Sequence, residues 1–216
     1  MDVFSRIDEA RHVCNVLEHP FYERWSAGEL SAEELGFYAG QYHHAVVALA
    51  QASSEAAAKA EAEHRAGLEH HAVEEHSHVV LWDEFAKAAG APAGLALAET
   101  EECAQAWTAG EDLLEHLAVL YAIEASQPEI AQTKLDGLVE RYGYTPEGPA
   151  VEYFELHATL DVEHARQARE LIEQLMSRDE VEAKAQAERM VARARTALAG
   201  NWTLLDGVDR RFGHAT

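Results

Sequence analysis

A long helix is encoded in the stretch SAEELGFYAGQYHHAVVALAQASSEAAA, residues 31–58. Ser31 and Glu34 have the spacing of a capping box, in which each side chain accepts a hydrogen bond from the other residue's backbone N–H. Alanine, leucine and glutamate dominate the rest of the stretch, and these residues favour helix over strand. The stretch therefore predicts one long helix that begins at Ser31 and ends near Ala58.

The same pattern extends to both sides of this helix. Glycine and proline separate helical stretches rather than interrupt them, and β-branched runs are rare. Pro128 should kink or divide one of these helices. The other predicted helices span about residues 2–17, 61–89, 100–110, 112–138, 150–176 and 179–205. About seven helices with no strand pattern and no internal repeat predict an all-α bundle that forms a single domain over residues 1–216.

Composition excludes several classes of function. The net charge of −22 argues against binding to nucleic acid or anionic membranes, since both need basic patches. No stretch approaches the roughly 18 apolar residues of a membrane span, and the N-terminus lacks the basic start of a signal peptide. Cys14 and Cys103 have no zinc-type spacing, so we expect free thiols. These features predict a cytoplasmic protein without a nucleic-acid or membrane partner.

The strongest chemical signal is His157-x-x-x-Asp161-x-x-His164. Positions i, i+4 and i+7 lie on one helical face. Phe154 and Leu171 flank this seam, which suggests that the face is buried. Burying three such polar groups without partners would cost several kcal/mol, a cost that a metal ion would remove. A solvated polar face with histidines present by chance remains the alternative for this triplet alone.

Two weaker sequence signals add further candidate metal ligands. Glu75 and His78 lie at i, i+3, the spacing by which a bundle helix offers a carboxylate and an imidazole to a dinuclear centre. Glu74 lies at i, i+4 from His78 and would also reach a metal there. Glu124 directly follows the core-like run LYAI, although a single glutamate is more often simply exposed.

Together these residues provide three imidazoles and three carboxylates. They are Glu75, His78, Glu124, His157, Asp161 and His164. Two Fe²⁺ ions would leave about one net positive charge with these ligands. Mixed nitrogen and oxygen ligation with open positions suits iron or manganese better than zinc. The set predicts a centre of two redox-active metals that reduces O₂.

Four segments carry a resemblance to a known family. They are LEHPFYERWSAGEL (17–30), HVVLW (78–82), LYAIEASQP (120–128) and YFELHATLDVEHAR (153–166). Over about residues 1–175 the chain resembles the heme-oxygenase-like diiron oxidases, in the superfamily of the TenA thiaminases and PqqC. It is most similar to the CADD-like enzymes that form 4-aminobenzoate for folate biosynthesis. The resemblance implies a heme-oxygenase-like fold, an Fe/Fe or Mn/Fe centre, O₂ as co-substrate, an external reductant and a homodimer.

The resemblance also implies roles for individual residues. Five metal ligands of the family fall on His78, Glu124, His157, Asp161 and His164. The first glutamate is nearer to its histidine here than in the 4-aminobenzoate-forming relatives, as in the fatty-acid decarboxylase branch. This interval favours Glu75 over Glu74 as the sixth ligand, with Glu74 and His71 expected to support the ligands or to replace one.

The 4-aminobenzoate branch takes the ring of its product from one of its own tyrosines. Tyr22 matches that tyrosine, Lys134 matches a lysine implicated beside it, and Tyr38 matches a second tyrosine near the site. A core aromatic or a surface charge would be the default interpretation without the resemblance. The substrate is therefore expected to be self-derived or a small aromatic molecule.

Three alternatives remain open at this point. The first keeps the two metals but oxidises or decarboxylates an external fatty acid or amino acid, as the short interval before His78 would favour. The second is a metal-free enzyme of the TenA or PqqC kind, although neither cysteine stands where a nucleophile is expected. The third is a non-enzymatic regulator, which no basic surface or helix-turn-helix pattern supports.

Overall fold

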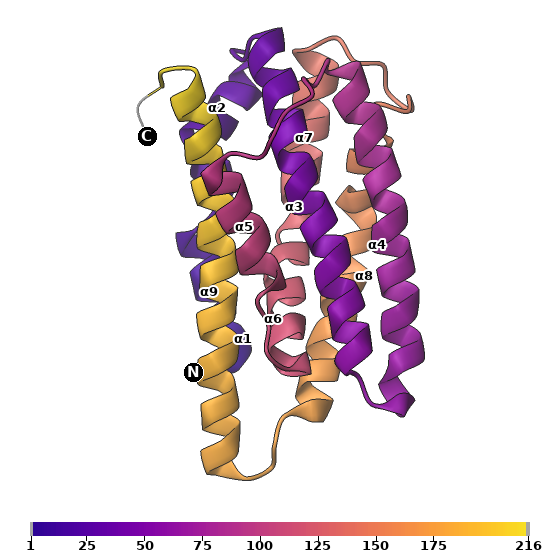
Figure 1. Cartoon of the computed structure of the whole chain (residues 1–216), viewed down its shortest axis with the longest axis vertical. Helices are drawn as coiled ribbons and strands as arrows, with labels where there is room; N and C mark the ends of the chain where they lie inside the picture. The colour runs from indigo at the N-terminus through magenta and orange to yellow at the C-terminus, as the bar shows by residue number, and fades with distance from the viewer. Residues whose placement is uncertain (1, 215–216) are drawn as a thin grey trace.

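The computed structural model describes residues 2–214, in which the long helices run roughly along one common axis (Figure 1). The α-helices are α1 Val3–Val13, α2 Pro20–Ala27, α3 Ala32–Lys59, α4 Ala62–Ala88, α5 Ala98–Thr108, α6 Leu113–Glu124, α7 Gln127–Glu140, α8 Glu152–Leu175 and α9 Glu180–Arg211. A single 3₁₀ turn, η1, spans Val16–Glu18. No strand occurs among the described residues, so the predicted all-α class is confirmed.

Helix α3 begins with the predicted capping box. The Ser31 hydroxyl accepts a hydrogen bond from the Glu34 N–H at 3.2 Å, and the Glu34 carboxylate accepts one from the Ser31 N–H at 2.8 Å. These bonds satisfy two N–H groups that a helix start leaves open. The helix then packs along α4 and also contacts α5, α6 and α9, so much of its length is buried.

The chain differs from the prediction near its N-terminus. The helix predicted over 2–17 ends four residues early, because the Asn15 side chain accepts a hydrogen bond from a backbone N–H and starts η1 instead. Helix α2 was not predicted. His19 caps it by accepting a hydrogen bond from the Phe21 N–H at 3.0 Å, and Pro20 is its first residue. Proline is favoured at that position, since no intrahelical partner is lost there.

Pro128 divides the helix predicted over 112–138. Helix α6 ends at Glu124 and α7 begins at Gln127. With this division and the additional α2, the described residues contain nine α-helices rather than about seven. Helix α9 also continues beyond the predicted end near residue 205, because Val208 is still buried.

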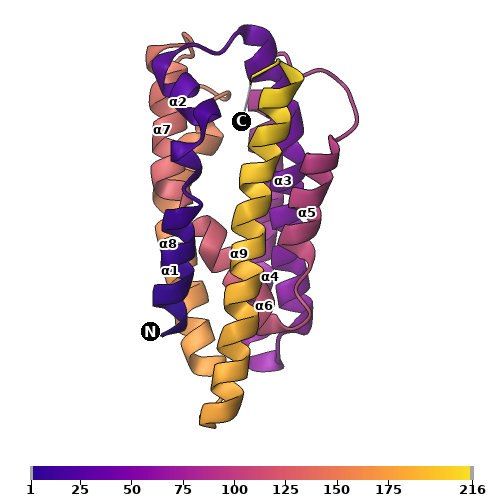
Figure 2. The same ribbon diagram turned by 90° about the vertical axis from the view of Figure 1, so that its left-hand side faces the viewer.

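Helix α9 packs against α1, α5 and α6 on the side of the bundle seen in Figure 2. On the other side, α4 and α8 pack against each other, while α6 contacts α8 from within the bundle. Aromatic side chains fill the interior between α2, α3 and α4, with Trp25 and Trp82 fully buried. The Trp82 indole N–H donates to the Ala39 carbonyl at 2.8 Å, which joins α4 to α3.

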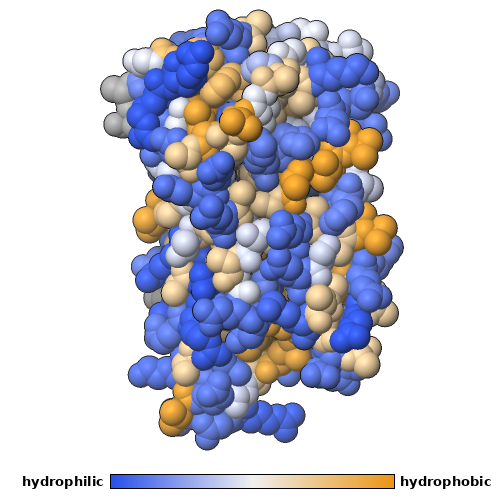
Figure 3. Space-filling view, in the orientation of Figure 1, coloured by the Kyte–Doolittle hydropathy of each residue, from blue (hydrophilic) through white to orange (hydrophobic). Residues whose placement is uncertain are grey.

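The face shown in Figure 3 is mostly hydrophilic, with hydrophobic residues in separate small patches. Among the described helices, none combines the length and the apolar character needed to cross a membrane.

Candidate metal centre

Three helices bring seven polar side chains together in the interior of the bundle. Helix α4 contributes three, α6 contributes its last residue and α8 contributes three. They are His71, Glu75, His78, Glu124, His157, Asp161 and His164, and none is more than 9% exposed. This set, called the histidine–carboxylate cluster below, contains all six residues predicted as ligands and also His71.

One sequence pattern occurs on both α4 and α8. Residues 71–78 and 157–164 each read His-x-x-x-acid-x-x-His. Since i, i+4 and i+7 share a face of a helix, each helix directs two imidazoles and one carboxylate to the same side. The sequence interpretation left His71 outside the main ligand set. The match between the two patterns is the signal that could have included it.

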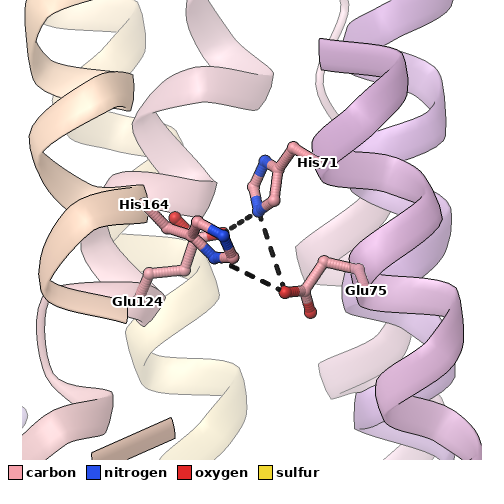
Figure 4. A group of neighbouring side chains, drawn as sticks. All are labelled: His71, Glu75, Glu124 and His164. Atoms are coloured by element: carbon pink, nitrogen blue, oxygen red, sulfur yellow. Dashed lines mark ion pairs between the residues drawn. The ribbon is translucent and has the colours of Figure 1, made fainter. Parts of the chain in front are cut away.

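The first half of the cluster joins His71, Glu75, Glu124 and His164, whose donor atoms all lie within 4.8 Å of one another. Figure 4 shows these four side chains converging from α4, α6 and α8. His71 Nε2 lies 2.9 Å from Glu124 Oε1 and 3.8 Å from Glu75 Oε1. His164 Nδ1 lies 3.7 Å from the same Glu75 oxygen. Four such donors surround a space suited to one metal ion.

The second half joins Glu75, His78 and His157, again within 4.8 Å of one another. His78 Nδ1 lies 3.0 Å from Glu75 Oε1. The His157 Nδ1–H donates to the Tyr153 carbonyl at 2.6 Å, which leaves Nε2 as the free donor atom. Glu75 is the one residue common to both groups.

Every side chain of the cluster has a buried polar atom without a hydrogen-bond partner. These atoms are His71 Nε2, Glu75 Oε1, His78 Nδ1, His157 Nε2, His164 Nδ1 and both carboxylate oxygens of Glu124 and Asp161. Several of them lie within ion-pair distance of each other but are not aligned for hydrogen bonds. Leaving one such group unsatisfied costs about 1–3 kcal/mol, and more when it is charged. The cluster fits a metal centre, because metal ions would bind these lone pairs.

The pKa values of the cluster reflect this crowding. Burial and the neighbouring Glu124 and Glu75 carboxylates raise the pKa of Asp161 well above its usual range. Burial lowers the pKa of His157 to about 4. For His71, burial opposes protonation, but Glu124 and Glu75 raise its pKa to about 9. Protons thus take up the excess negative charge, and bound metal ions would displace them.

Glu74 lies at the edge of the cluster. Its side chain is 34% exposed, and its carboxylate oxygens lie 3.5 Å from His164 Nε2 and 3.5 Å from the exposed His70. The Glu75 side chain is 2% exposed. This geometry places Glu75 among the donor atoms and Glu74 between the cluster and the surface.

The other predicted site residues, Tyr22, Tyr38 and Lys134, form a second group, which contacts Trp82 of α4. The hydroxyls of Tyr22 and Tyr38 are 2.8 Å apart, and both rings are buried. Lys134 Nζ lies 5.4 Å from the centre of the Tyr22 ring and 4.4 Å from that of Tyr42. Burial lowers the pKa of this lysine to about 7. The structure thus brings Tyr22, Tyr38 and Lys134 into one packed group of aromatic rings around the lysine amine, called the aromatic cluster below.

Tyr153 and Trp82 connect this aromatic cluster to the histidine–carboxylate cluster. The Tyr153 ring stacks on the His157 imidazole at 3.9 Å and lies 4.9 Å from the Trp82 ring. The Trp82 ring in turn lies 5.7 Å from Lys134 Nζ. The sequence interpretation did not identify either residue as part of the site, since a buried aromatic residue on a helix is usually only core.

Neither cysteine belongs to the site. Cys103 is buried between other helices, and Cys14 lies at the end of α1. Burial raises the pKa of both thiols, the opposite of what a nucleophilic cysteine needs. This arrangement weighs against the metal-free alternative.

Known proteins similar to this chain fall into one group. The model of a family described as iron-containing redox enzymes matches residues 37–200. A 4-aminobenzoate synthase of Chlamydia muridarum is 34% identical over 208 residues, which cover 90% of this chain and 87% of that protein. A 4-aminobenzoate synthase of Nitrosomonas europaea is 32% identical over 228 residues, covering 95% and 89%.

Solved structures are similar in fold at low sequence identity. A domain of unknown function with a heme oxygenase-like fold from Shewanella denitrificans has a TM-score of 0.79 at 17% identity, covering 98% of this chain and 94% of that one. A TenA homologue from Pseudomonas syringae has a TM-score of 0.81 at 16% identity, covering 96% and 91%. The predicted heme-oxygenase-like fold is confirmed.

Proposed function

Because this chain belongs to the family of iron-containing redox enzymes with a heme oxygenase-like fold, we propose that its cluster binds two iron ions and that it forms 4-aminobenzoate. Two relatives at 32–34% identity over most of the chain bear the name 4-aminobenzoate synthase. These relationships support an enzyme over the non-enzymatic alternative.

The observation that carries the two-ion proposal is the position of Glu75. It belongs to both groups of donors, which otherwise share no residue. The two groups contain four imidazoles and two carboxylates, and Asp161 lies outside both groups, 3.7 Å from His164 Nδ1. If Asp161 is counted with them, two Fe²⁺ ions would leave the centre with about one positive charge. A mixed Mn/Fe pair fits the same donors. Iron bound here would supply the reduction of O₂, with an external reductant providing electrons.

The protein's own residues prepare this centre. The Tyr153 carbonyl holds the His157 ring with Nε2 toward the cluster, so the ligand does not have to change tautomer when a metal binds. The Tyr153 ring covers one face of the same imidazole.

We further propose that Tyr22 provides the ring of the product. A tyrosine ring carries its two substituents para to each other, as 4-aminobenzoate does. Tyr22 is 2% exposed, and its hydroxyl contacts Tyr38 rather than solvent. Lys134 is the amine beside it, and because burial lowers the pKa of this amine to about 7, a large fraction is uncharged at neutral pH.

The experiment is to compare Tyr22→Phe with the wild type after loading with iron and exposure to O₂ with a reductant. We expect Tyr22→Phe to bind iron normally but to form no 4-aminobenzoate, and the wild type to show a mass change in the peptide that contains Tyr22. Tyr121→Phe is the matched control, since Tyr121 is also buried but bonds to Asp8 on α1. Unchanged product from Tyr22→Phe would rule out the self-derived ring.

An external fatty acid or amino acid is the second candidate substrate. One observation favours it: a cavity of about 260 Å³ reaches His71 and His164 from the surface. In that case Tyr22→Phe should turn over the external acid at the wild-type rate, so the same variant separates the two substrates.

A further inference from the structure

The cavity beside the histidine–carboxylate cluster lies between the first half of α4, the middle of α6 and α8. Its inner end is formed by His71 and His164, whose buried ring nitrogens lack hydrogen-bond partners. Leucines from all three helices form its walls. It therefore connects one half of the cluster with the solvent.

The outer end of the cavity has acidic and imidazole groups. The Glu63 side chain is 78% exposed, and its carboxylate lies 3.2 Å from Nε2 of the half-buried His64. No lysine or arginine lines the described cavity. A carboxylate with three imidazoles attracts a divalent cation. The same lining offers no lysine or arginine to an incoming carboxylic acid.

Gly67 keeps the passage open. It lies inside α4, where glycine is less favourable than alanine. A Cβ atom at this position would meet nothing within 4 Å. Packing against a neighbour therefore does not require glycine here, and any larger side chain would extend into the cavity that Gly67 lines.

We propose that this cavity is the route by which divalent metal ions enter the cluster, with Glu63 and His64 as a transient first binding site. His64, Leu68, His71 and Glu75 follow one another on a single face of α4, so an ion passes from one imidazole to the next along the helix. Glu74 stands beside the inner end, 3.5 Å from His164 Nε2.

This inference rests on the proposed function. If the ring of the product comes from Tyr22, no organic substrate needs to enter, whereas the metal ions and O₂ do. O₂ needs neither a carboxylate nor imidazoles on its way. The carboxylate and the imidazoles that line the cavity are therefore suited to the passage of metal ions.

The test measures how fast metal-free protein takes up a metal ion. Anaerobic stopped-flow mixing of the chelator-treated full chain with Co²⁺, and then with Fe²⁺, gives the rate from visible absorption or tryptophan fluorescence. The variants are Glu63→Gln with His64→Gln at the mouth, and Gly67→Leu in the passage. Glu69→Gln and Ala66→Leu are the matched controls, because both residues are exposed on α4 and do not line the cavity.

We expect about a tenfold slower uptake in the double variant, at the low end of the range for electrostatic steering. Gly67→Leu should also slow uptake, and both should reach the wild-type metal content at equilibrium. The controls should load as fast as the wild type.

Wild-type uptake rates in both the double variant and Gly67→Leu would overturn the route. A lowered final metal content in the double variant would overturn it as well, since these residues would then be permanent ligands. If the wild type itself bound no metal, the proposed function would fail first, and the inference with it.

Discussion

Two clusters of buried ionisable side chains lie in this bundle, and they differ in how their charges are balanced. Near the chain's C-terminus, Arg24 pairs with Glu34 at 2.6 Å and with Asp209 at 2.5 Å, while His214 lies 2.9 Å from Glu34. This arginine–carboxylate cluster contains its own cation, Arg24, and joins α2, α3 and α9. The histidine–carboxylate cluster has no lysine or arginine among its members. In the first cluster Asp209 Oδ2 is the only buried side-chain atom that lacks a hydrogen-bond partner, whereas in the second every side chain has such an atom, as a cluster that could hold metal ions would.

The largest effect should come from removing a ligand of the histidine–carboxylate cluster. In Glu124→Gln we expect metal affinity to fall by more than about 100-fold, since even residues that only orient ligands are worth 10–100-fold. At pH 7 the metal-free variant should be less stable than the metal-free wild type, because the His71 imidazole loses the carboxylate, 2.9 Å away, that raises its pKa. Calorimetric titration with Fe²⁺ and thermal unfolding without metal check both statements.

The stabilisation of the wild type by bound iron provides a second check on Glu124. Iron at a thousand times the Kd should stabilise it by about 4 kcal/mol, and at the same iron concentration the gain should fall to about 1.4 kcal/mol or less in Glu124→Gln. An equal gain in the variant would remove Glu124 from the centre.

Breaking the arginine–carboxylate cluster should lower the stability of the protein and leave iron binding unchanged. Arg24→Ala leaves the Glu34 and Asp209 carboxylates without their main partner, so we expect a loss of about 3–5 kcal/mol in the free energy of unfolding. Iron content should not change. Arg6→Ala is the control, because its pair with the exposed Glu188 should be worth no more than about 1 kcal/mol. Urea unfolding measures both, and equal losses would mean that burial does not distinguish the two pairs.

Lys134 gives a clearer contrast with Arg24, because no acidic partner shifts the pKa of its buried amine and burial alone lowers it. Its folded pKa of about 7 is below the ordinary value of 10.5, so the unfolded chain binds more protons between these values and stability rises with pH. Lys134→Met should therefore stabilise the protein by roughly 2–4 kcal/mol at pH 7 or below, an advantage that vanishes near pH 10.5. Product formation should be lost. Lys87→Met, at a lysine whose side chain is 78% exposed, should change stability by less than about 0.5 kcal/mol. A destabilised Lys134→Met would show that the surrounding rings hold the ammonium form.

The smallest effect concerns Glu34. Burial acts to raise its pKa, but hydrogen bonds from Ser31, Arg24 and His214 lower it to about 2. Because the folded pKa is depressed, the stabilisation is present above the unfolded value of 4.5 and is lost as pH falls from there to about 2. Glu34→Gln should thus be less stable than the wild type by roughly 2–3 kcal/mol at pH 7 and equal to it near pH 2. A constant difference across this range would contradict the assigned bonds.

Much of this architecture could be predicted from the sequence, because the signals are local. The capping box at Ser31 and the division at Pro128 depend on residues within one helical turn. Helix α2 was missed because the His19-Pro20 pair was interpreted as a break, although it starts a helix. The length of α9 was underestimated, since its last turns are held by packing that local sequence does not reveal.

The candidate site also has a part that local sequence predicts and a part that depends on how the helices pack. Residues that share one face of a helix follow from spacing, so the sequence predicted that His157, Asp161 and His164 lie together on α8, which the structure confirms. Which side chains of α4 face that triplet depends on how the two helices pack, and this is why the position of His71 emerged only from the structure. Trp82 and Tyr153, which link the aromatic cluster to the histidine–carboxylate cluster, lie on α4 and α8, and their contact could not be identified from either helix alone.

The most direct test of the two-metal centre is the metal content of the protein purified after expression with iron, measured by elemental analysis beside the His164→Ala variant. We expect about two iron ions per chain in the wild type and a clear loss in the variant. No metal above trace in the wild type, with the variant indistinguishable from it, would contradict the account.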